Sequence, residues 1–259
     1  MKIGLIGCGT VGGTLYQWLT EYTRHDVFVK DPLKGFHDDL KSNKVEAIFI
    51  SIPVNPGPKG QDQVNLVSAV EQAKQITSHV FIRSTVLPGT NDRLKTYSMP
   101  EFLTARRAYE DFIKLPLVFG EAPHDLIQSI FKNKIQTDKK YIHVSNIAAE
   151  TAKYTHNLFG ASKVLYFNII KQYCDMYEID FEQVKQAANI TGFLGTEHMQ
   201  VPGPDGKLGF GGTCFGPNLE SFINSMGEEV FLKDEKEYFE KIRKINLAYR
   251  GSHTWIFVI

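Results

Sequence analysis

Three residues with chemically reactive or polar side chains lie in two sequence motifs, a glycine-rich segment and a predicted helix. Cys214 lies in the glycine-rich segment Gly209–Phe215, where small neighbours let a substrate approach and a thiol can form and release a thioester. Lys153 and Asn157 are spaced i,i+4, so on a helix both side chains reach one patch, where they could stabilise an oxyanion and bind water. Each setting has a plain alternative. A free cysteine is usually a small buried apolar residue, and a Lys–Asn pair is usually part of a solvated helix face.

A glycine fingerprint at the start of the chain is the second chemical signal. Gly7, Gly9 and Gly12 match G-x-G-x-x-G directly after a predicted strand. Thr10 and Val11 lie where the next helix opens. The three glycines suit a tight turn, close approach of a pyrophosphate to the backbone, and close contact between helix and strand. The phosphates of a dinucleotide would then lie at the positive N-terminus of the helix, the alternative being a plain glycine-rich turn.

Further residues complete the predicted dinucleotide site at the ends of later strands. Asp31 closes the second predicted strand, where a carboxylate accepts the ribose hydroxyls and repels a 2′-phosphate, so NAD is favoured over NADP. Two neighbouring lysines weaken that preference. Pro53 leaves the third predicted strand, and Ser84 and Thr85 end the fourth, where α/β sheets place their ligands. The Thr85 hydroxyl could orient water or the nicotinamide, or both hydroxyls could make turn hydrogen bonds.

The elements that position these residues alternate over the first 145 residues. Short, nearly continuous apolar runs are typical of strands buried on both faces of a parallel sheet, and helical patterns lie between them. The predicted strands are Lys2–Ile6, Asp26–Lys30, Ala47–Ile52, Val80–Val86, Leu115–Phe119 and Lys140–Val144, and the predicted helices are Val11–Tyr22, Gln61–Ile76 and His124–Lys132. This alternation predicts an α/β fold, a Rossmann-type doubly wound parallel sheet. The Pro/Gly-rich segment 53–60 is expected to be a loop.

From Asn146 the pattern becomes mostly helical. One long helix is expected from Asn146 to about Tyr177, with Gly160 as its internal breaker. The remaining expectations are helices at Phe181–Ala188, Leu219–Met226 and Glu235–Arg250, and an irregular glycine-rich segment at Thr191–Gly216. The chain is therefore expected to hold two domains, a dinucleotide-binding domain at 1–145 and a helical central domain at 146–259.

The composition excludes several functional classes. The 259 residues carry 29 basic and 29 acidic side chains, so a general electrostatic grip on nucleic acid or an anionic membrane is not expected. No apolar run is long enough to span a bilayer, the closing segment 255–259 included. Three widely spaced cysteines without a CxxC motif predict neither a disulfide framework nor a metal site. Reduced thiols favour a cytoplasmic protein.

Five sequence blocks together resemble the UDP-glucose/GDP-mannose (nucleotide-sugar) dehydrogenase family. Besides the glycine fingerprint, Arg83–Thr90 reads R-S-T-V-L-P-G-T and Met99–Leu103 reads M-P-E-F-L. Glu150–Asn157 resembles the family's E-x-x-K-Y-x-x-N helix, and Gly209–Phe215 is similar to its G-F-G-G-x-C-F cysteine loop. The blocks follow the family's order and cover nearly the whole chain.

The resemblance implies an NAD-dependent double oxidation of a primary alcohol, on a nucleotide sugar or a sugar, to the carboxylate. It makes Cys214 the nucleophile that carries first a thiohemiacetal and then a thioester, with Lys153 and Asn157 assisting. Glu101 matches the family's general base for thioester hydrolysis, the alternative being a surface carboxylate. The resemblance also implies a homodimer through the long helix from Asn146, the alternative being a helix used wholly within the chain.

The sequence departs from the family's pattern at four positions. The family's cysteine loop continues C-x-P-K-D, which puts Pro217 at the lysine and Asn218 at the catalytic aspartate. Asn218 can hydrogen-bond the same water but cannot take a proton. Ala105 and Ile169 stand where the family commonly has carboxylates. After Arg250 only nine residues follow, so the family's nucleotide-binding third domain is expected to be missing or to come from a separate chain.

These departures leave a second hypothesis open, a catalytically impaired NAD-binding pseudoenzyme that acts with a partner chain. A third hypothesis is a one-step β-hydroxyacid dehydrogenase, whose fold also joins a Rossmann domain to a helical part. Such enzymes need no cysteine loop, so the segment Gly209–Phe215 argues against this third hypothesis.

Overall fold

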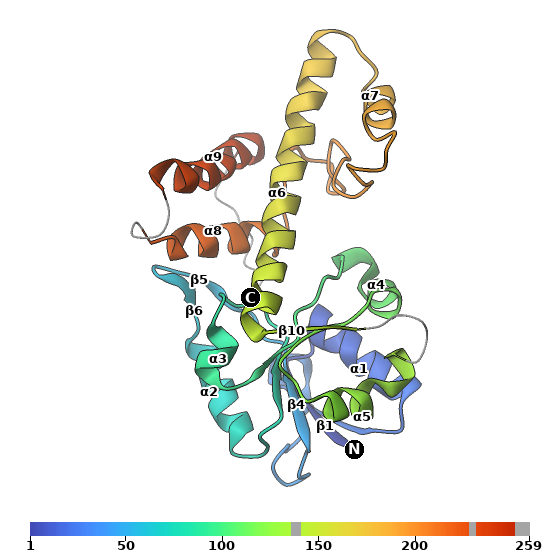
Figure 1. Cartoon of the computed structure of the whole chain (residues 1–259), viewed down its shortest axis with the longest axis vertical. Helices are drawn as coiled ribbons and strands as arrows, with labels where there is room; N and C mark the ends of the chain where they lie inside the picture. Colours follow the sequence, from blue (N-terminus) through green and yellow to red (C-terminus); the bar gives the residue numbers. More distant parts are fainter. Residues whose placement is uncertain (136–140, 228–231, 252–259) are drawn as a thin grey trace. The chain divides into compact units, whose positions relative to one another are not determined.

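The computed structural model describes residues 1–135, 141–227 and 232–251 (Figure 1). Within this structure the chain divides into two compact units. The first comprises Met1–Asn55 and Gln61–Tyr154, and the second comprises Pro56–Gly60 and Thr155–Ile259. The domain limits expected from the sequence, 1–145 and 146–259, remain a prediction.

The first unit is built on a mostly parallel eight-stranded sheet. Its strands are β1 (Lys2–Ile6), β2 (Asp26–Asp31), β3 (Phe36–His37), β4 (Ala47–Ile50), β7 (Val80–Ile82), β8 (Tyr97–Ser98), β9 (Val118–Gly120) and β10 (Ile142–Val144). They lie in the order β10-β9-β8-β7-β4-β1-β2-β3, with β1 paired in parallel to both β2 and β4. A separate two-stranded sheet joins β5 (Asn55–Gly57) to β6 (Gly60–Asp62). The Rossmann-type α/β fold predicted from the sequence is confirmed.

Several details of the predicted strands are wrong for identifiable reasons. The sheet is not wholly parallel, because β3 and β9 run antiparallel to β2 and β8 respectively. The strands β3, β5, β6 and β8 have only two or three residues each, too few for a periodic pattern. The predicted strand Leu115–Phe119 begins later, at Val118, since Pro116 has no N–H for the ladder. Lys140, the predicted start of the last strand, lies outside the described residues.

The helices of the first unit follow the predictions closely where the apolar pattern is long. They are α1 (Thr10–Tyr22), α2 (Val64–Lys74), α3 (Thr90–Leu94), α4 (Ala108–Lys114) and α5 (His124–Ile135). The helix expected from Gln61 begins later, at Val64, because the preceding residues belong to β6. The sequence did not predict α3 and α4, which have five and seven residues.

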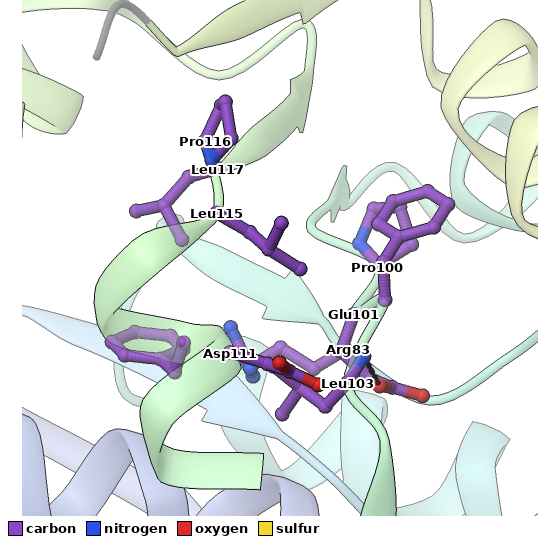
Figure 2. Close-up of a pocket in the computed structure, with 10 residues that line it drawn as sticks. Arg83, Pro100, Glu101, Leu103, Asp111, Leu115, Pro116 and Leu117 are labelled. Carbon is purple, nitrogen blue, oxygen red and sulfur yellow. Dashed lines mark hydrogen bonds between the residues drawn. The ribbon is translucent and has the colours of Figure 1, made fainter. Parts of the chain in front are cut away.

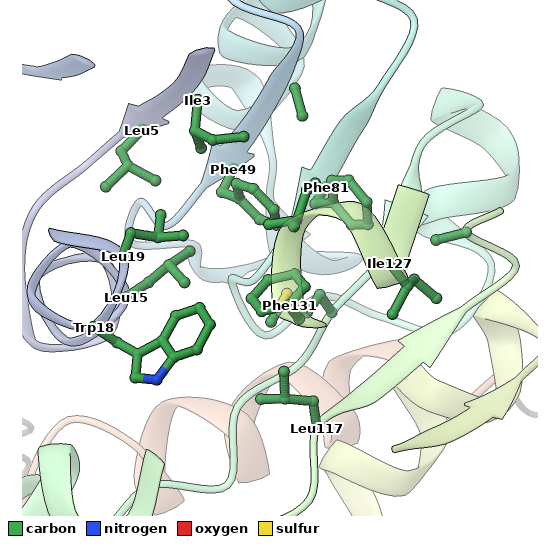
Figure 3. Packing of buried hydrophobic residues seen from close by; sticks show 14 of the residues in the cluster. Ile3, Leu5, Leu15, Trp18, Leu19, Phe49, Phe81, Leu117, Ile127 and Phe131 are labelled. Carbon is green, nitrogen blue, oxygen red and sulfur yellow. The ribbon is translucent and has the colours of Figure 1, made fainter. Parts of the chain in front are cut away.

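Both faces of the central strands are buried. On one face, Phe49 and Phe81 stack with ring centroids 4.6 Å apart in a cluster that also includes Trp18 of α1 and Phe131 of α5 (Figure 3). The opposite face packs Ile48 and its neighbours against α2. Each fully buried large side chain of this kind contributes about 1.5–3 kcal/mol. Helices therefore cover both faces of the sheet, as the continuous apolar runs predict.

The long helix α6 (Asn146–Met176) begins in the first unit, where two buried side chains fix its start. The Asn146 side-chain oxygen accepts a hydrogen bond from the Ser98 N–H at 2.9 Å. The Glu150 carboxylate accepts bonds from the Gly89 N–H at 2.6 Å and the Asn91 N–H at 2.7 Å. Burial raises the pKa of Glu150, although these hydrogen bonds oppose the shift. Hydrogen bonds between residues that are far apart in sequence thus fix the first turns of α6.

The second unit consists of the rest of α6 with α7 (Phe181–Ala188), α8 (Phe215–Ser225) and α9 (Lys233–Arg250). A small core of four buried residues includes Cys174, so this cysteine is a buried apolar residue. The predicted start of α8 at Leu219 is wrong, because the helix begins directly after Cys214. Pro217 is tolerated there since it lies in the first turn, where backbone N–H groups have no intrahelical partner.

None of the helices in the described ranges combines the length and apolar character that a bilayer crossing needs.

Candidate active site

The glycine loop between β1 and α1 has the geometry that a dinucleotide requires. Gly7 has φ +88°, and a Cβ there would lie 2.5 Å from the Ser51 carbonyl oxygen. A Cβ on Gly12 would lie 2.0 Å from the Gly7 carbonyl oxygen, so only glycine permits this contact between helix and strand. Gly9 faces open space, and no side chain caps the N-terminus of α1. The cradle therefore fits a pyrophosphate at the amide groups of Thr10 and its neighbours.

Asp31 ends β2 beside this loop. Its Oδ2 accepts a hydrogen bond from the Cys8 N–H at 2.6 Å, which fixes the carboxylate against the glycine turn. Burial and the charge of Asp31 raise the pKa of the Cys8 thiol, with Lys34 opposing the shift. Cys8 therefore stays protonated near neutral pH, which suits a residue with no chemical role.

The other predicted cofactor residues follow neighbouring parallel strands. Pro53 is exposed three residues after β4. Ser84 donates its hydroxyl hydrogen to the Ile52 carbonyl at 2.6 Å, and the Thr85 carbonyl accepts a bond from Gln61 at 2.9 Å. Ser84 therefore makes one of the turn hydrogen bonds that the sequence left as an alternative. The carboxyl ends of β1, β2, β4 and β7 gather the predicted cofactor residues at one edge, as in other open α/β sheets.

Glu101 and Lys153 form a buried ion pair. The Lys153 Nζ lies 3.0 Å from the Glu101 Oε1, and the side chains are only 4% and 9% exposed for lysine and glutamate respectively. The other carboxylate oxygen accepts the Leu103 N–H at 2.7 Å, and the Lys153 ammonium lies 5.5 Å from the centroid of the Phe102 ring. The alternatives of a surface carboxylate and a solvated helix face are therefore wrong, and Asn157 on the same helix is buried as well.

Arg83 is a further residue of this region, which its sequence motif alone did not single out. It lines a cavity of about 20 Å³ together with Glu101 and Asp111, room for about one water molecule (Figure 2). The guanidinium is fully buried. Its Nη1 contacts the Met99 sulfur at 3.4 Å, while its Nε has no hydrogen-bond partner in the described residues. Burial lowers the pKa of Arg83 to about 10, and Glu101 opposes the shift. The signal in the sequence is a charged residue directly after the apolar strand β7.

Asp111 closes the same cavity from α4. Its Oδ2 accepts the Thr104 N–H at 2.8 Å, and its Oδ1 lies 2.9 Å from the Arg107 Nε. Burial by itself would raise the pKa of Asp111, but these hydrogen bonds and the Arg107 charge hold it below its usual value. The carboxylate is therefore ionised at neutral pH and fixes the chain that follows Glu101.

In the second unit, Cys214 is exposed at the N-cap of α8. The alternative of a small buried apolar residue is therefore wrong for this cysteine. Its carbonyl oxygen accepts both the backbone N–H of Asn218 at 3.1 Å and the Asn218 Nδ2 at 2.6 Å. Two buried amide atoms, the Asn218 Oδ1 and the Asn157 Nδ2, lack hydrogen-bond partners among the described residues. These two amide atoms are free to bond a water molecule or a bound ligand.

A metal centre has no support in the part of the chain that the structure describes, which holds no group of three or more potential His, Cys, Asp or Glu ligands. The Glu101 carboxylate is paired with the Lys153 ammonium instead.

The fold and the glycine cradle define a Rossmann-type dinucleotide-binding protein. A sequence profile described as the UDP-glucose/GDP-mannose dehydrogenase family, central domain, matches residues 147–248. The putative UDP-glucose 6-dehydrogenase YtcA of Bacillus subtilis is 26% identical over 97% of this chain and 74% of its own length. The chain therefore resembles the UDP-glucose/GDP-mannose dehydrogenase family, and the matched range includes Lys153 and Cys214. The chain spans about half the length of several other curated relatives.

Two solved structures show how far the fold itself is shared. The UDP-glucose dehydrogenase of Pyrobaculum islandicum matches with a TM-score of 0.79 at 21% identity, over 95% of this chain and 68% of that one. The 3-hydroxyisobutyrate dehydrogenase of Mycobacterium tuberculosis matches with a TM-score of 0.68 at 12% identity, over 96% and 94%. The fold is thus common to both classes, and the cysteine loop and family profile separate them.

Proposed function

We propose that this chain oxidises the primary alcohol of a nucleotide sugar to the carboxylate with NAD as the oxidant. The net reaction converts R–CH2OH, two NAD⁺ and water to R–COO⁻, two NADH and three protons. The observation that carries the proposal is the buried pair of Glu101 and Lys153, a base and a cation held 3.0 Å apart. The glycine cradle and Asp31 support NAD as the cofactor.

Each candidate residue has a role that its chemistry supports. Cys214 adds to the aldehyde formed in the first oxidation, and its exposure at the start of α8 suits attack on a bound substrate. The Lys153 ammonium and the Asn157 amide stabilise the oxyanion of the thiohemiacetal. When bound, NAD accepts the hydride in both oxidations. Glu101 then takes the proton from the water that hydrolyses the thioester on Cys214, while Thr85 orients that water or the cofactor.

Asn218 changes the electrostatics of this mechanism without removing its base. An amide at this position cannot accept the proton, but the charge of Lys153 is already balanced by Glu101. The Asn218 side chain instead caps the carbonyl of Cys214. Hydrolysis therefore depends on Glu101, and a slow second half-reaction is expected.

The test combines purified protein, NAD and a panel of UDP-, GDP- and ADP-sugars, followed by NADH absorbance and acid analysis. We expect two NADH for each sugar consumed. The Cys214→Ser variant should still bind NAD but form no acid. Cys174→Ser is the matched control, because that cysteine is buried in the small core away from solvent. Acid formation by Cys214→Ser at the wild-type rate would remove the covalent step.

A second candidate function is favoured by Asn218 itself, an NAD-binding protein with impaired catalysis that acts with a partner chain. It predicts NAD binding that Gly12→Ala weakens and no turnover of any sugar in the panel. Turnover that depends on Cys214 would reject it. Restoration of turnover by Asn218→Asp would support it, since that substitution returns the carboxylate of the family pattern.

The homodimer is a further part of the proposal. On α6, Phe159, Tyr166 and Tyr173 are 69%, 57% and 55% exposed and recur every seven residues, the spacing of a helix-pairing seam. Ile169 and Met176 extend the same stripe. Light scattering is expected to give twice the chain mass, and Tyr166→Lys is expected to lower it. A monomeric wild type would contradict this interface.

A further inference from the structure

The start of the cysteine loop is held by side chains rather than by regular backbone pairing. Gly209 and Phe210 are buried, and each of their backbone polar groups bonds to a side chain. The Asn168 Oδ1 accepts the Gly209 N–H at 2.9 Å, and an Arg250 Nη2 donates to the Gly209 carbonyl at 2.9 Å. Asn246 accepts the Phe210 N–H at 2.7 Å and donates to the Phe210 carbonyl at 3.0 Å. Two helices, α6 and α9, thus fix the course of this irregular segment.

Asn246 makes the most specific of these contacts. It is 0% exposed on α9, and both ends of its amide bind the backbone of one residue. The fit depends on Gly209, because a Cβ there would lie 2.4 Å from the Asn246 Oδ1 and the residue has φ +68°. One turn earlier on the same helix face, Ile242 is buried as an ordinary apolar residue. An amide at position 246 therefore serves the loop rather than the packing of α9.

The other end of the loop is fixed by an aromatic side chain. Phe215 follows Cys214 directly, and its ring lies where a Cβ on Gly160 of α6 would be, 2.6 Å from the Phe215 Cζ. The Phe210 and Phe215 rings meet edge to face with centroids 6.1 Å apart. Cys214 thus belongs to the exposed stretch Gly212–Cys214 of a segment whose two ends are both anchored.

We propose that Asn246 is a positioning residue for Cys214. It acts through the backbone of Phe210, which sets the path of the loop that presents the thiol. The inference rests on the proposed function, in which Cys214 attacks the substrate carbonyl. Misplacement of a reacting group by about 1 Å can cost about 100-fold in rate, and loss of both Asn246 hydrogen bonds frees the loop to move that far.

The first test compares Asn246→Leu with Ile242→Ala, which removes packing from the same face of α9 but no bond to the loop. Asn246→Leu is expected to lower kcat by about 100-fold while KM for NAD changes by less than about twofold, since the glycine cradle lies in the first unit. Ile242→Ala is expected to lower the Tm but keep most of kcat. Equal losses of kcat in the two variants would overturn the inference.

Asn246→Asp provides a pH-dependent rescue. A protonated carboxylic acid offers one donor and one acceptor as the amide does, whereas a carboxylate would place a second acceptor against the Phe210 carbonyl. Burial favours the neutral acid, while Arg250 on the next turn, paired with Asp205, favours the carboxylate. Relative to wild type, kcat of Asn246→Asp is expected to fall as pH rises, and that of Asn246→Leu to show no such trend. The inference would be overturned if kcat of Asn246→Asp, relative to wild type, did not change with pH and equalled the relative kcat of Asn246→Leu.

Alkylation of Cys214 by iodoacetamide, located by mass spectrometry, separates this inference from the proposed function because it needs no substrate. The alkylation rate is expected to change in Asn246→Leu and to stay at the wild-type value in Ile242→Ala. A wild type without turnover on any sugar would refute the proposed function, yet this difference in alkylation would still support the positioning role. Identical alkylation rates in all three proteins would overturn it.

Discussion

Gly160→Ala tests whether the helix α6 is shaped for the residue that follows the cysteine. In an ordinary helix interior this change stabilises a protein by about 0.5–1 kcal/mol, because alanine has less conformational freedom to lose. Here the new Cβ would lie 2.6 Å from the Phe215 Cζ and 3.0 Å from its Cε1. An ordinary contact begins at 3.4 Å, so the ring must shift by about 0.8 Å.

The two effects have opposite signs, and their sizes decide the outcome. Overpacking of a buried contact costs about 1–3 kcal/mol, which exceeds the gain in helix propensity. The free energy of unfolding is therefore expected to fall by about 0.5–2 kcal/mol, a Tm decrease of roughly 2–6 °C for a chain of this size. Because Phe215 is bonded directly to Cys214, kcat is expected to fall by about tenfold or more as well.

The assay is thermal unfolding by circular dichroism alongside NADH formation. Gly13→Ala in α1 is the matched control, since its Cβ would meet nothing closer than 3.4 Å and should be neutral or stabilising. Phe215→Leu in the Gly160→Ala background should recover part of the lost stability by removing ring atoms at the contact. If Gly160→Ala raised the Tm as much as Gly13→Ala, the packing of Phe215 on α6 described above would be refuted.

Three other perturbations test the first unit. Gly12→Ala places a Cβ 2.0 Å from the Gly7 carbonyl oxygen, so the helix must move away from the strand and NAD affinity by calorimetry should fall at least about tenfold; unchanged affinity would contradict the cradle. Lys153→Met leaves the buried Glu101 charge without its partner and should lower the free energy of unfolding in urea by about 3–5 kcal/mol. Adding Glu101→Gln to the same chain should recover part of this loss. A loss below about 1 kcal/mol would argue against a buried pair. The pKa of Asp111 is lower in the folded protein than in the unfolded chain, where it is near 3.9. The ionised carboxylate therefore stabilises the fold above about pH 3.9, and this contribution is lost as the pH falls through the pKa of the folded state. Asp111→Asn should therefore flatten the urea midpoint profile between roughly pH 2 and 5, and an unaltered slope would be inconsistent with the lowered pKa.

The sequence by itself determined the elements whose signals are local. The strand, glycine turn and helix from Lys2 to Tyr22 were predictable because the apolar run, the three glycines and the helical periodicity all lie within about twenty residues. The long helix α6 followed from a similar short-range pattern. The exposure of Cys214 was left open by the sequence and came from the structure. Short strands such as β3 were not predictable, since two residues carry no period.

Only the tertiary structure decided which side chains meet. Glu101 and Lys153 lie 52 positions apart and pair because strand order and the start of α6 bring them together. The burial of Arg83 and the hold of Asn246 on the backbone of Phe210 likewise depend on elements distant in sequence. Local patterns report which face of an element is apolar, but hydrogen bonds and ion pairs between elements depend on positions accurate to a fraction of an ångström. That accuracy comes only from the packing of the whole unit.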